Sequence, residues 1–162
     1  MRPMKTAVIY YSLEGNMEFI AQKLGEGGNV DLCRLVPKKE YPKGKISKFV
    51  WGGKSATFGE MPALEDIKLN LEEYDTLVIG TPIWAGTMTP PVLTFLHDNK
   101  IIDKKIILVT TCGGGGSENA VDKMKEFLSG STVIDAINFV NPLKNQNEEF
   151  QNKIEKIRSL MA

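Results

Sequence analysis

The segment TAVIYYSLEGNMEFIAQKLG, residues 6–25, changes its pattern of apolar residues near its centre. Its first part, Thr6–Tyr11, is a short continuous run of apolar and β-branched residues, which is typical of a buried parallel strand. Its last part spaces apolar residues as a helix does, from Met17 to Leu24, and Gly25 offers a natural end to that helix. The residues between the two parts are mostly small or polar. The segment therefore predicts a strand that enters a helix through a tight turn.

The same alternation of strand and helix patterns continues along the chain. Together with the first, the runs with strand character are Thr6–Tyr11, Val30–Val36, Thr76–Gly80, Lys105–Thr110 and Val133–Val140. A further helix is expected to start at Pro90 with Thr89 as its N-cap, and two more cover Ala120–Leu128 and Phe150–Met161. Strands that alternate with helices imply right-handed crossovers. We therefore predict an α/β fold, a doubly wound parallel sheet of five strands with helices on both faces.

The stretch between the second and third predicted strands, residues 37–74, shows no clear period. It is too long for a plain connection in a compact domain, so we expect a helix and a loop over one face of the sheet. The helix is placed within Ile46–Thr57, where Gly52 and Gly53 interrupt it.

The composition is that of an ordinary soluble globular protein, and 162 residues suit one domain, residues 1–162. Twenty basic and twenty acidic residues cancel, so no overall charge favours nucleic acid or an anionic membrane as a partner. No apolar run approaches the roughly 18 residues that span a bilayer, and Ala7–Tyr11 is too short for the core of a signal peptide. Cys33 and Cys112 are too few for a disulfide framework or a metal site. These features predict a cytoplasmic protein with reduced thiols and no metal.

Three of the predicted strands end in turns of unusual composition: SLEGNM at residues 12–17, TPIWAGTMTPP at 81–91 and TCGGGGSEN at 111–119. In an open parallel sheet, ligands bind beyond the carboxyl ends of the strands, near the point where the strand order reverses. We therefore expect the three turns to meet at one edge of the sheet and to form a binding site there.

Each turn has a functional and a purely structural interpretation. Backbone N–H groups and the helix dipole after the first strand suit an anion, with Ser12 and Asn16 as side-chain donors, although capped turns use the same residue types. Trp84 offers a planar stacking surface in its Gly- and Pro-rich turn, or it packs back onto the core. Four consecutive glycines, Gly113–Gly116, permit the close approach of a flat ligand or serve as a flexible connection.

In their order and spacing these turns resemble the flavodoxin family. SLEGNM resembles its phosphate loop, usually written S/T-x-T-G-x-T, and the other two turns resemble the loops that clasp the isoalloxazine ring. The resemblance extends from Lys5 to about Leu160. It implies the strand order 2-1-3-4-5 and a non-covalent FMN, with the phosphate at the first turn and one ring edge at each of the others. The cofactor-binding residues that it implies are Ser12, Leu13, Glu14, Gly15, Asn16, Met17, Thr81, Pro82, Ile83, Trp84, Ala85, Gly86, Thr111, Cys112, Gly113, Gly114 and Gly115.

The chain departs from the family pattern in the phosphate loop. Only Ser12 remains of the three hydroxyl groups, since Glu14 and Met17 occupy the other two positions. Each lost charge-assisted hydrogen bond weakens binding by about 1.5–3 kcal/mol. We therefore expect the main chain to hold the phosphate while the Glu14 side chain points to solvent.

A second departure concerns the flavin ring, which flavodoxins commonly hold between two aromatic side chains. No aromatic residue lies between Thr110 and Asn119. One face of the ring is therefore expected to be open, or covered by Trp51, Phe58 or a partner.

The resemblance implies a redox protein, and we expect electron transfer through FMN to a redox partner protein or a small-molecule acceptor. In flavodoxin-like proteins a peptide in the third-strand loop reorients to bind the reduced ring, and Ala85–Gly86 is the matching place, where glycine permits the change. The open flavin face and the neutral charge favour an alternative, an FMN-dependent reductase of a small acceptor such as a quinone. A flavin-free binding module of the same fold is a further alternative. No catalytic residue is assigned, and we expect a monomer or a weak homodimer.

Three other classes of site are excluded by single residues. The tripeptide Gly53–Ser55 would end a P-loop, but the glycine required five residues earlier is Lys48. A phospho-receiver module needs acidic residues after the first strand and an aspartate after the third, where this chain has Ser12 and Thr81. His97 is the only histidine, so a histidine-based catalytic triad or zinc site would rest on one residue.

Overall fold

The computed structural model describes residues 5–41 and 59–162. Five parallel strands form the sheet in the order β2-β1-β3-β5-β6, and a short strand, β4, pairs antiparallel with the end of β3. This order confirms the predicted 2-1-3-4-5, because β5 and β6 are the fourth and fifth parallel strands along the chain. The elements are β1 (Thr6–Tyr10), α1 (Asn16–Gly25), β2 (Val30–Arg34), η1 (Leu71–Glu73), β3 (Thr76–Trp84), β4 (Thr87–Met88), α3 (Pro90–Asp98), β5 (Lys105–Cys112), α4 (Glu118–Phe127), β6 (Thr132–Val140) and α5 (Glu148–Met161).

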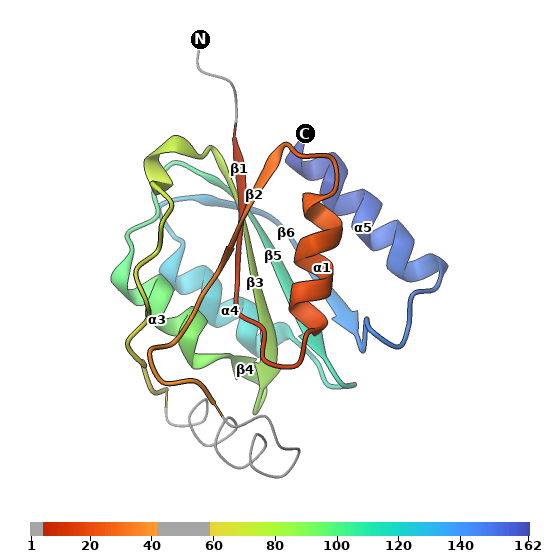
Figure 1. The fold of residues 1–162 in the computed structure, drawn as a ribbon, viewed down its shortest axis with the longest axis horizontal. Helices are drawn as coiled ribbons and strands as arrows, with labels where there is room; N and C mark the ends of the chain where they lie inside the picture. The colour runs from red at the N-terminus through yellow and green to blue at the C-terminus, as the bar shows by residue number, and fades with distance from the viewer. Residues whose placement is uncertain (1–4, 42–58) are drawn as a thin grey trace.

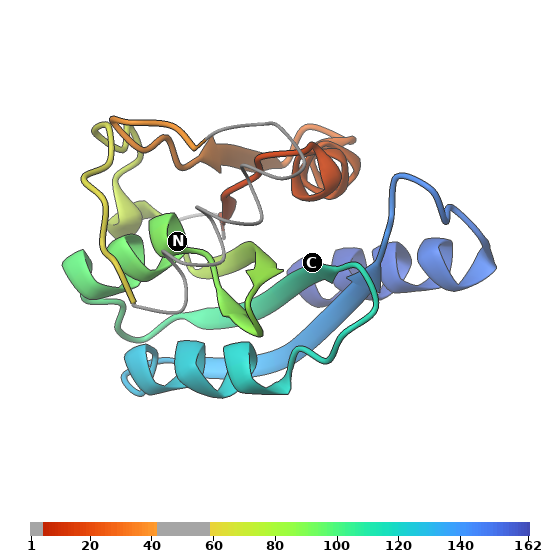
Figure 2. The same ribbon diagram turned by 90° about the horizontal axis from the view of Figure 1, so that it is seen from below.

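Helices cover both faces of the sheet, as Figures 1 and 2 show. Successive side chains of a strand point to opposite faces. In β1, Ala7 and Ile9 belong to the buried cluster that packs α3 and α4, whereas Val8 belongs to the cluster that packs α1 and α5. Because both faces of the sheet are covered, a ligand has access mainly to the ends of the strands.

Two central strands are longer than the sequence pattern predicted. β3 continues to Trp84 and β5 to Cys112, so residues 81–84 and 111–112, which we assigned to turns, lie in the sheet. The pairing of β3 with β5 reaches Pro82, beyond the last residue pair of β1 and β3. A proline is tolerated there because β1 no longer pairs with the other side of β3. β4 then turns back along β3, and the sequence pattern did not indicate this hairpin.

The four helices predicted within the described residues are confirmed, with ends that differ by a few residues at most. α3 begins after Thr89, as expected, but the Thr89 side chain does not cap the helix. Its hydroxyl oxygen lies 3.0 Å from the hydroxyl oxygen of Thr81, and its N–H donates to the same Thr81 oxygen. Both threonines are fully buried. The pair therefore closes the base of the β3–β4 hairpin.

The described parts of residues 37–74 extend the sheet edge beyond β2. Pro37 forms an antiparallel bridge with Leu64, and backbone hydrogen bonds flank this bridge on both sides. The short 3₁₀ helix η1 then leads into β3. Outside the described residues lie the predicted helix within Ile46–Thr57, the tripeptide Gly53–Ser55, Trp51 and Phe58.

In residues 5–41 and 59–162, no helix is long and apolar enough to cross a membrane. The same residues contain no group of three side chains that could hold a metal ion. Cys33 and Cys112 both carry free thiols.

Candidate functional site

The loops that follow β1, β3, β5 and β6 gather at the carboxyl edge of the sheet, at the bottom of Figure 1. Side-chain hydrogen bonds join them. Asn119 Nδ2 donates to Gly86 O at 3.2 Å, which links the start of α4 to the β3–β4 hairpin. Leu143 N donates to Asn16 Oδ1 at 3.3 Å, which links the loop after β6 to the start of α1. The turns singled out in the sequence are therefore parts of one edge.

The turn between β1 and α1 presents hydrogen-bond donors at the N-terminus of a ten-residue helix. Gly15 holds φ at +100°, a left-handed conformation that favours glycine. The buried Ser12 Oγ accepts hydrogen bonds from Gly15 N and Glu18 N, both at 3.2 Å. Because a serine hydroxyl has two lone pairs and one proton, these bonds leave the proton for an outside acceptor. The N–H groups of Asn16 and Met17 also have no acceptor within the helix, so the turn suits an anion.

The side chains of this turn point in different directions. Met17 is 0% exposed and packs against Gly80, where an added Cβ would lie 2.6 Å from Met17 Cε. Met17 is therefore a core residue, and only its main chain is available to a ligand. The Glu14 side chain is exposed, as expected, and a carboxylate near a helix N-terminus is favourable to the helix dipole.

Ala85 and Gly86 form the two-residue turn of the β3–β4 hairpin, and both have positive φ, 51° and 76°. Positive φ at both central residues defines a type I′ turn. Reorienting the peptide between them would convert the turn to type II′, whose first central residue needs a conformation that glycine alone adopts readily. The expectation that Gly86 permits this reorientation is therefore incomplete, because Ala85 opposes it.

Trp84 is half-buried at the end of β3 and lies in an aromatic cluster with Tyr11 and Tyr41. Its ring centroid is 5.8 Å from that of Tyr11 and 5.2 Å from that of Tyr41, with nearly perpendicular ring planes. The hydroxyl of the buried Tyr11 donates to Glu40 Oε1 at 2.5 Å. Burial, together with this hydrogen bond, raises the pKa of Tyr11, so its phenol stays protonated and keeps donating. The cluster fixes the orientation of the Trp84 ring.

Sequence analysis missed Tyr11 and Tyr41 as neighbours of the site. Tyr11 is the last residue of the first predicted strand and directly precedes Ser12, a position that could have indicated it. Tyr41 gave no signal, because it is 43 residues from Trp84 along the chain and only the tertiary fold brings the two rings together.

The loop after β5 is open to solvent. Gly113–Gly116 are all exposed, and a Cβ added at Gly114 or Gly115 would meet no atom within 4 Å. Gly114 has a φ of +147°, which favours glycine, whereas Gly115 has no such backbone requirement. Cys112 Sγ donates to Gly115 O at 3.1 Å and so folds the loop over the end of β5. Packing within the protein does not explain why residue 115 is a glycine, whereas the close approach of a ligand to the backbone would explain it.

The implied site residues differ in what they can offer to a ligand. Leu13 and Met17 have buried apolar side chains, and the buried Thr81 hydroxyl is held by Thr89, so these residues could contact a ligand only through the main chain. The Trp84 ring and the exposed backbone of the hairpin and the glycine loop lie at the edge itself. Donors at a helix N-terminus fit a phosphate, and an indole beside two exposed glycine-containing turns fits a flat ring system. The residues present therefore fit the FMN that the resemblance implies.

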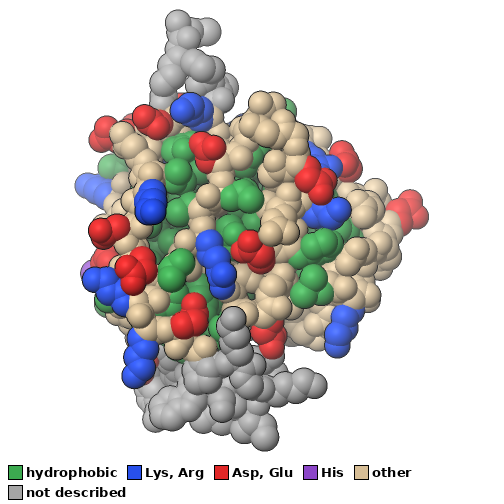
Figure 3. Space-filling view, in the orientation of Figure 1, with side chains coloured by type: hydrophobic (Ala, Val, Ile, Leu, Met, Phe, Trp, Pro, Cys, Tyr) green, Lys and Arg blue, Asp and Glu red, His purple; other side chains and the backbone are tan. Residues whose placement is uncertain are grey.

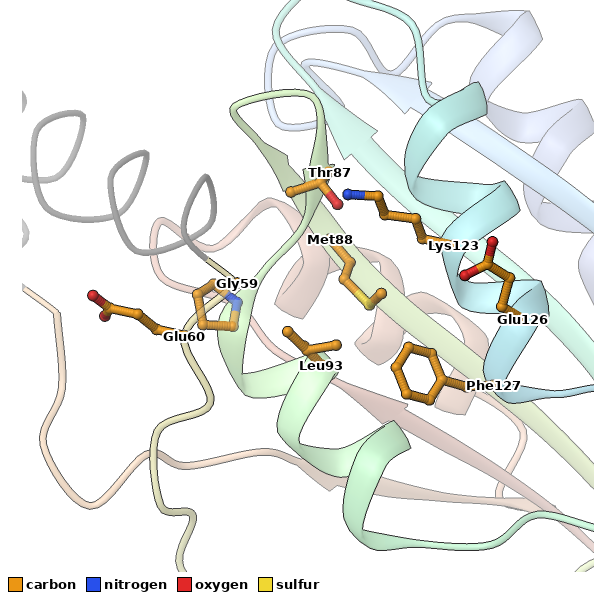
Figure 4. Close-up of a pocket in the computed structure, with 9 residues that line it drawn as sticks. Gly59, Glu60, Thr87, Met88, Leu93, Lys123, Glu126 and Phe127 are labelled. Carbon is orange, nitrogen blue, oxygen red and sulfur yellow. The ribbon is translucent and has the colours of Figure 1, made fainter.

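A separate cavity of about 140 Å³ lies beside the hairpin, between α3 and α4 (Figure 4). Its apolar lining includes Met88, Leu93 and Phe127, and the Lys123 side chain extends from α4 toward Thr87. None of the implied cofactor-binding residues lines this cavity. It therefore adjoins the candidate site through β4 without being part of it.

On the face shown in Figure 3, acidic, basic and apolar side chains of the described residues are interspersed, and no region of these residues is dominated by one sign of charge. Leu32 and Val36, at and just beyond the edge strand, are 39% and 43% exposed. This mixture agrees with the net charge of +0.

Comparison with known protein families matches residues 5–157 to the family described as Flavodoxin. Among solved structures, the chain is similar to a flavoprotein in complex with FMN from Lactobacillus acidophilus, with 21% identity, a TM-score of 0.72, and 88% of this chain and 97% of that chain covered. A protein from Bacteroides eggerthii has 22% identity and a TM-score of 0.75, with 98% of each chain covered. A protein from Bacteroides uniformis has 26% identity and a TM-score of 0.71, with 85% of this chain and 91% of that chain covered.

Proposed function

The chain belongs to the flavodoxin family, and on that premise we propose that it is a single-domain redox protein that binds FMN without a covalent bond. The cofactor lies at the carboxyl edge of the sheet, with its phosphate at residues 12–17 and its ring between residues 81–86 and 111–115. Bound FMN supplies the redox chemistry, while the protein supplies binding, orientation and electrostatics. The protein transfers electrons to a redox partner protein or a small acceptor in the cytoplasm, where its two free thiols remain reduced.

One observation supports this proposal more than any other: three turns of unusual backbone geometry lie at the same edge of a parallel sheet. Gly15 in the first turn, Ala85 and Gly86 in the second and Gly114 in the third all have positive φ. Strained or glycine-dependent backbone is concentrated where a chain approaches a ligand closely.

The phosphate is held mainly by the main chain. The N–H groups of Asn16 and Met17 point out of the first turn of α1, and the helix dipole adds a partial positive charge there. The Ser12 hydroxyl donates its remaining proton while its oxygen holds the turn together. Hydrogen bonds to an ionised group contribute about 1.5–3 kcal/mol each, so these donors offset the missing hydroxyl groups of the family pattern.

The ring is positioned by the hairpin and the glycine loop. Trp84 presents an indole that its tyrosine neighbours keep in one orientation. The Thr81–Thr89 hydrogen bond holds the hairpin at its base, and Asn119 holds it at its tip through Gly86 O. Because both ends of the hairpin are fixed, its backbone groups stay in place beside the ring.

The purified protein tests this proposal directly. We expect flavin absorbance bands, release of FMN on denaturation, and one equivalent of FMN bound when the folded apoprotein is titrated. A folded protein that takes up no FMN would contradict the proposal and favour the flavin-free binding module.

Two observations favour the second candidate, an FMN-dependent reductase of a small acceptor. The exposed Gly113–Gly115 leave room for an acceptor to approach. Ala85 opposes the reorientation of the Ala85–Gly86 peptide that would favour the transfer of single electrons. Rapid turnover of a nicotinamide cofactor with a quinone would establish the reductase, whereas slow turnover with fast exchange of single electrons would establish the carrier.

A further inference from the structure

Arg34, the last residue of the edge strand β2, reaches the turn that follows β1. Its Nη2 donates to Ser12 O at 2.5 Å, although the two residues are 22 positions apart. Arg34 stands opposite Tyr10 in the β1–β2 ladder, so its side chain starts next to the turn. Among the carboxylates of residues 5–41 and 59–162, none pairs with this guanidinium.

We propose that Arg34 is a positioning residue for the phosphate of the flavin, and that it acts in two ways. It orients a peptide of the phosphate-binding turn, and it places an unpaired positive charge beside that turn. This inference rests on the proposed function, because it concerns the same site.

The orientation follows from the geometry of the peptide group. Within residues 5–41 and 59–162 the peptide bonds are trans, and in a planar trans peptide the C=O and the next N–H point in opposite directions. Because Arg34 holds the Ser12 carbonyl, the N–H of Leu13 points away from the guanidinium. The Ser12 side chain already holds the N–H groups of Gly15 and Glu18. Arg34 and the Ser12 hydroxyl therefore fix the same turn from two sides.

The role of the positive charge of Arg34 follows from the charged groups around the turn. Glu14 lies in the turn, and Glu18, whose carboxylate accepts from the Tyr10 hydroxyl at 2.5 Å, lies in the first turn of α1. Both carboxylates repel a phosphate group, which carries about −1.5 to −2 charges at neutral pH. Arg34 is exposed, so its attraction for the phosphate is screened by salt. The part of the FMN affinity that comes from the phosphate group should accordingly fall as ionic strength rises.

A purely structural role is the competing explanation, in which Arg34 only ties β2 to the turn. The two roles differ in their dependence on the phosphate group. Riboflavin carries the same ring system as FMN but has no phosphate, so a positioning residue for the phosphate affects FMN and leaves riboflavin unchanged. A structural tie would affect both ligands alike.

The experiment compares wild type, Arg34→Met and Arg34→Lys by titrating each apoprotein with FMN and with riboflavin at low and high salt. Arg34→Met keeps the aliphatic stem, and Arg34→Lys keeps the charge but not the planar fork. Arg158→Met is the matched control, because Arg158 Nη2 donates to Lys23 O at 2.6 Å near the other end of α1. Urea unfolding of each apoprotein establishes that it is folded.

We expect Arg34→Met to weaken FMN binding on the order of tenfold, which corresponds to the loss of one hydrogen bond to a charged group. The FMN affinity of this variant should also depend less on salt than that of wild type. Riboflavin affinity should stay within about twofold, Arg34→Lys should restore part of the loss, and Arg158→Met should bind FMN as wild type does. Equal loss for both ligands, or unchanged FMN affinity in Arg34→Met, would overturn the inference while the proposed function stands. A folded wild type that binds neither ligand would overturn both.

Discussion

Replacing Gly15 tests whether the turn after β1 holds a phosphate, and Gly27 provides a matched control. Gly15 has a φ of +100°, and Gly27, in the loop between α1 and β2, has a φ of +111°. A Cβ at Gly15 would make only an ordinary contact, 3.7 Å from Leu143 Cδ1, and a Cβ at Gly27 would meet nothing within 4 Å. A side chain at either position therefore introduces the same kind of backbone strain, and its Cβ meets no close neighbour.

The expected loss of apoprotein stability is about 1–2 kcal/mol for Gly15→Val and for Gly27→Val, the cost of a left-handed conformation in a residue with a Cβ. The effects on FMN binding should differ. If Gly15→Val relieves its strain by rotating the turn, it moves the N–H groups that face the phosphate. Loss of one such bond, about 1.5–3 kcal/mol, weakens FMN roughly tenfold to 150-fold. Gly27→Val lies at the opposite end of α1 and should keep wild-type affinity.

Urea unfolding with and without FMN measures both effects in one assay. At a free FMN concentration of 100 times the wild-type Kd, the ligand adds about 2.7 kcal/mol to the stability of wild type and of Gly27→Val. A Gly15 variant that binds a hundredfold more weakly gains only about 0.4 kcal/mol. If Gly15→Val is too unstable to purify, Gly15→Ala tests the same point with less steric bulk. Wild-type FMN affinity in either folded Gly15 variant would refute the assignment of the phosphate to this turn.

Three further predictions concern the ring and the core. In a Trp51→Phe variant, tryptophan emission comes from Trp84 alone. Addition of FMN to this apoprotein should strongly quench the emission, and unchanged emission would show that Trp84 does not contact the ring. Ala85→Gly should allow the hairpin peptide to reorient, which spectroelectrochemistry would detect as a shift in the first reduction potential of bound FMN; an unaltered potential would contradict this. Gly80→Ala places a methyl group 2.6 Å from Met17 Cε, so its cost in stability, about 1–3 kcal/mol, should shrink in a Met17→Ala background. Strictly additive losses in urea unfolding would show that the two sites do not compete for the same space.

The elements that the sequence predicted correctly are those whose signal is local. The apolar run of β1 and the helical stripe of α1 each occupy one continuous segment, so hydrophobic periodicity alone reveals them. Strand order came from the resemblance, which rests on three turns whose spacing is also visible in the chain. The position of those turns after parallel strands was enough to predict that they share one edge, because such strands end on the same side of a sheet.

Features that depend on two distant segments required the tertiary structure. The extension of β3 to Trp84 is stabilised by pairing with β5 and β4, and no periodicity within residues 81–84 indicates it. The left-handed conformation of Ala85 likewise follows from the hairpin register and is not a preference of alanine.

The sequence by itself therefore determined the α/β class, the order of the main elements and the edge at which the three turns meet, where we propose that FMN binds, since each of these follows from local patterns and chain direction. The tertiary structure alone decided how individual side chains are used. Met17 belongs to the core because Gly80 leaves space for it, and Arg34 reaches Ser12 because β2 pairs beside β1. The physical reason is that burial and hydrogen bonding depend on neighbours in space, and those neighbours are set by the packing of segments far apart in the chain.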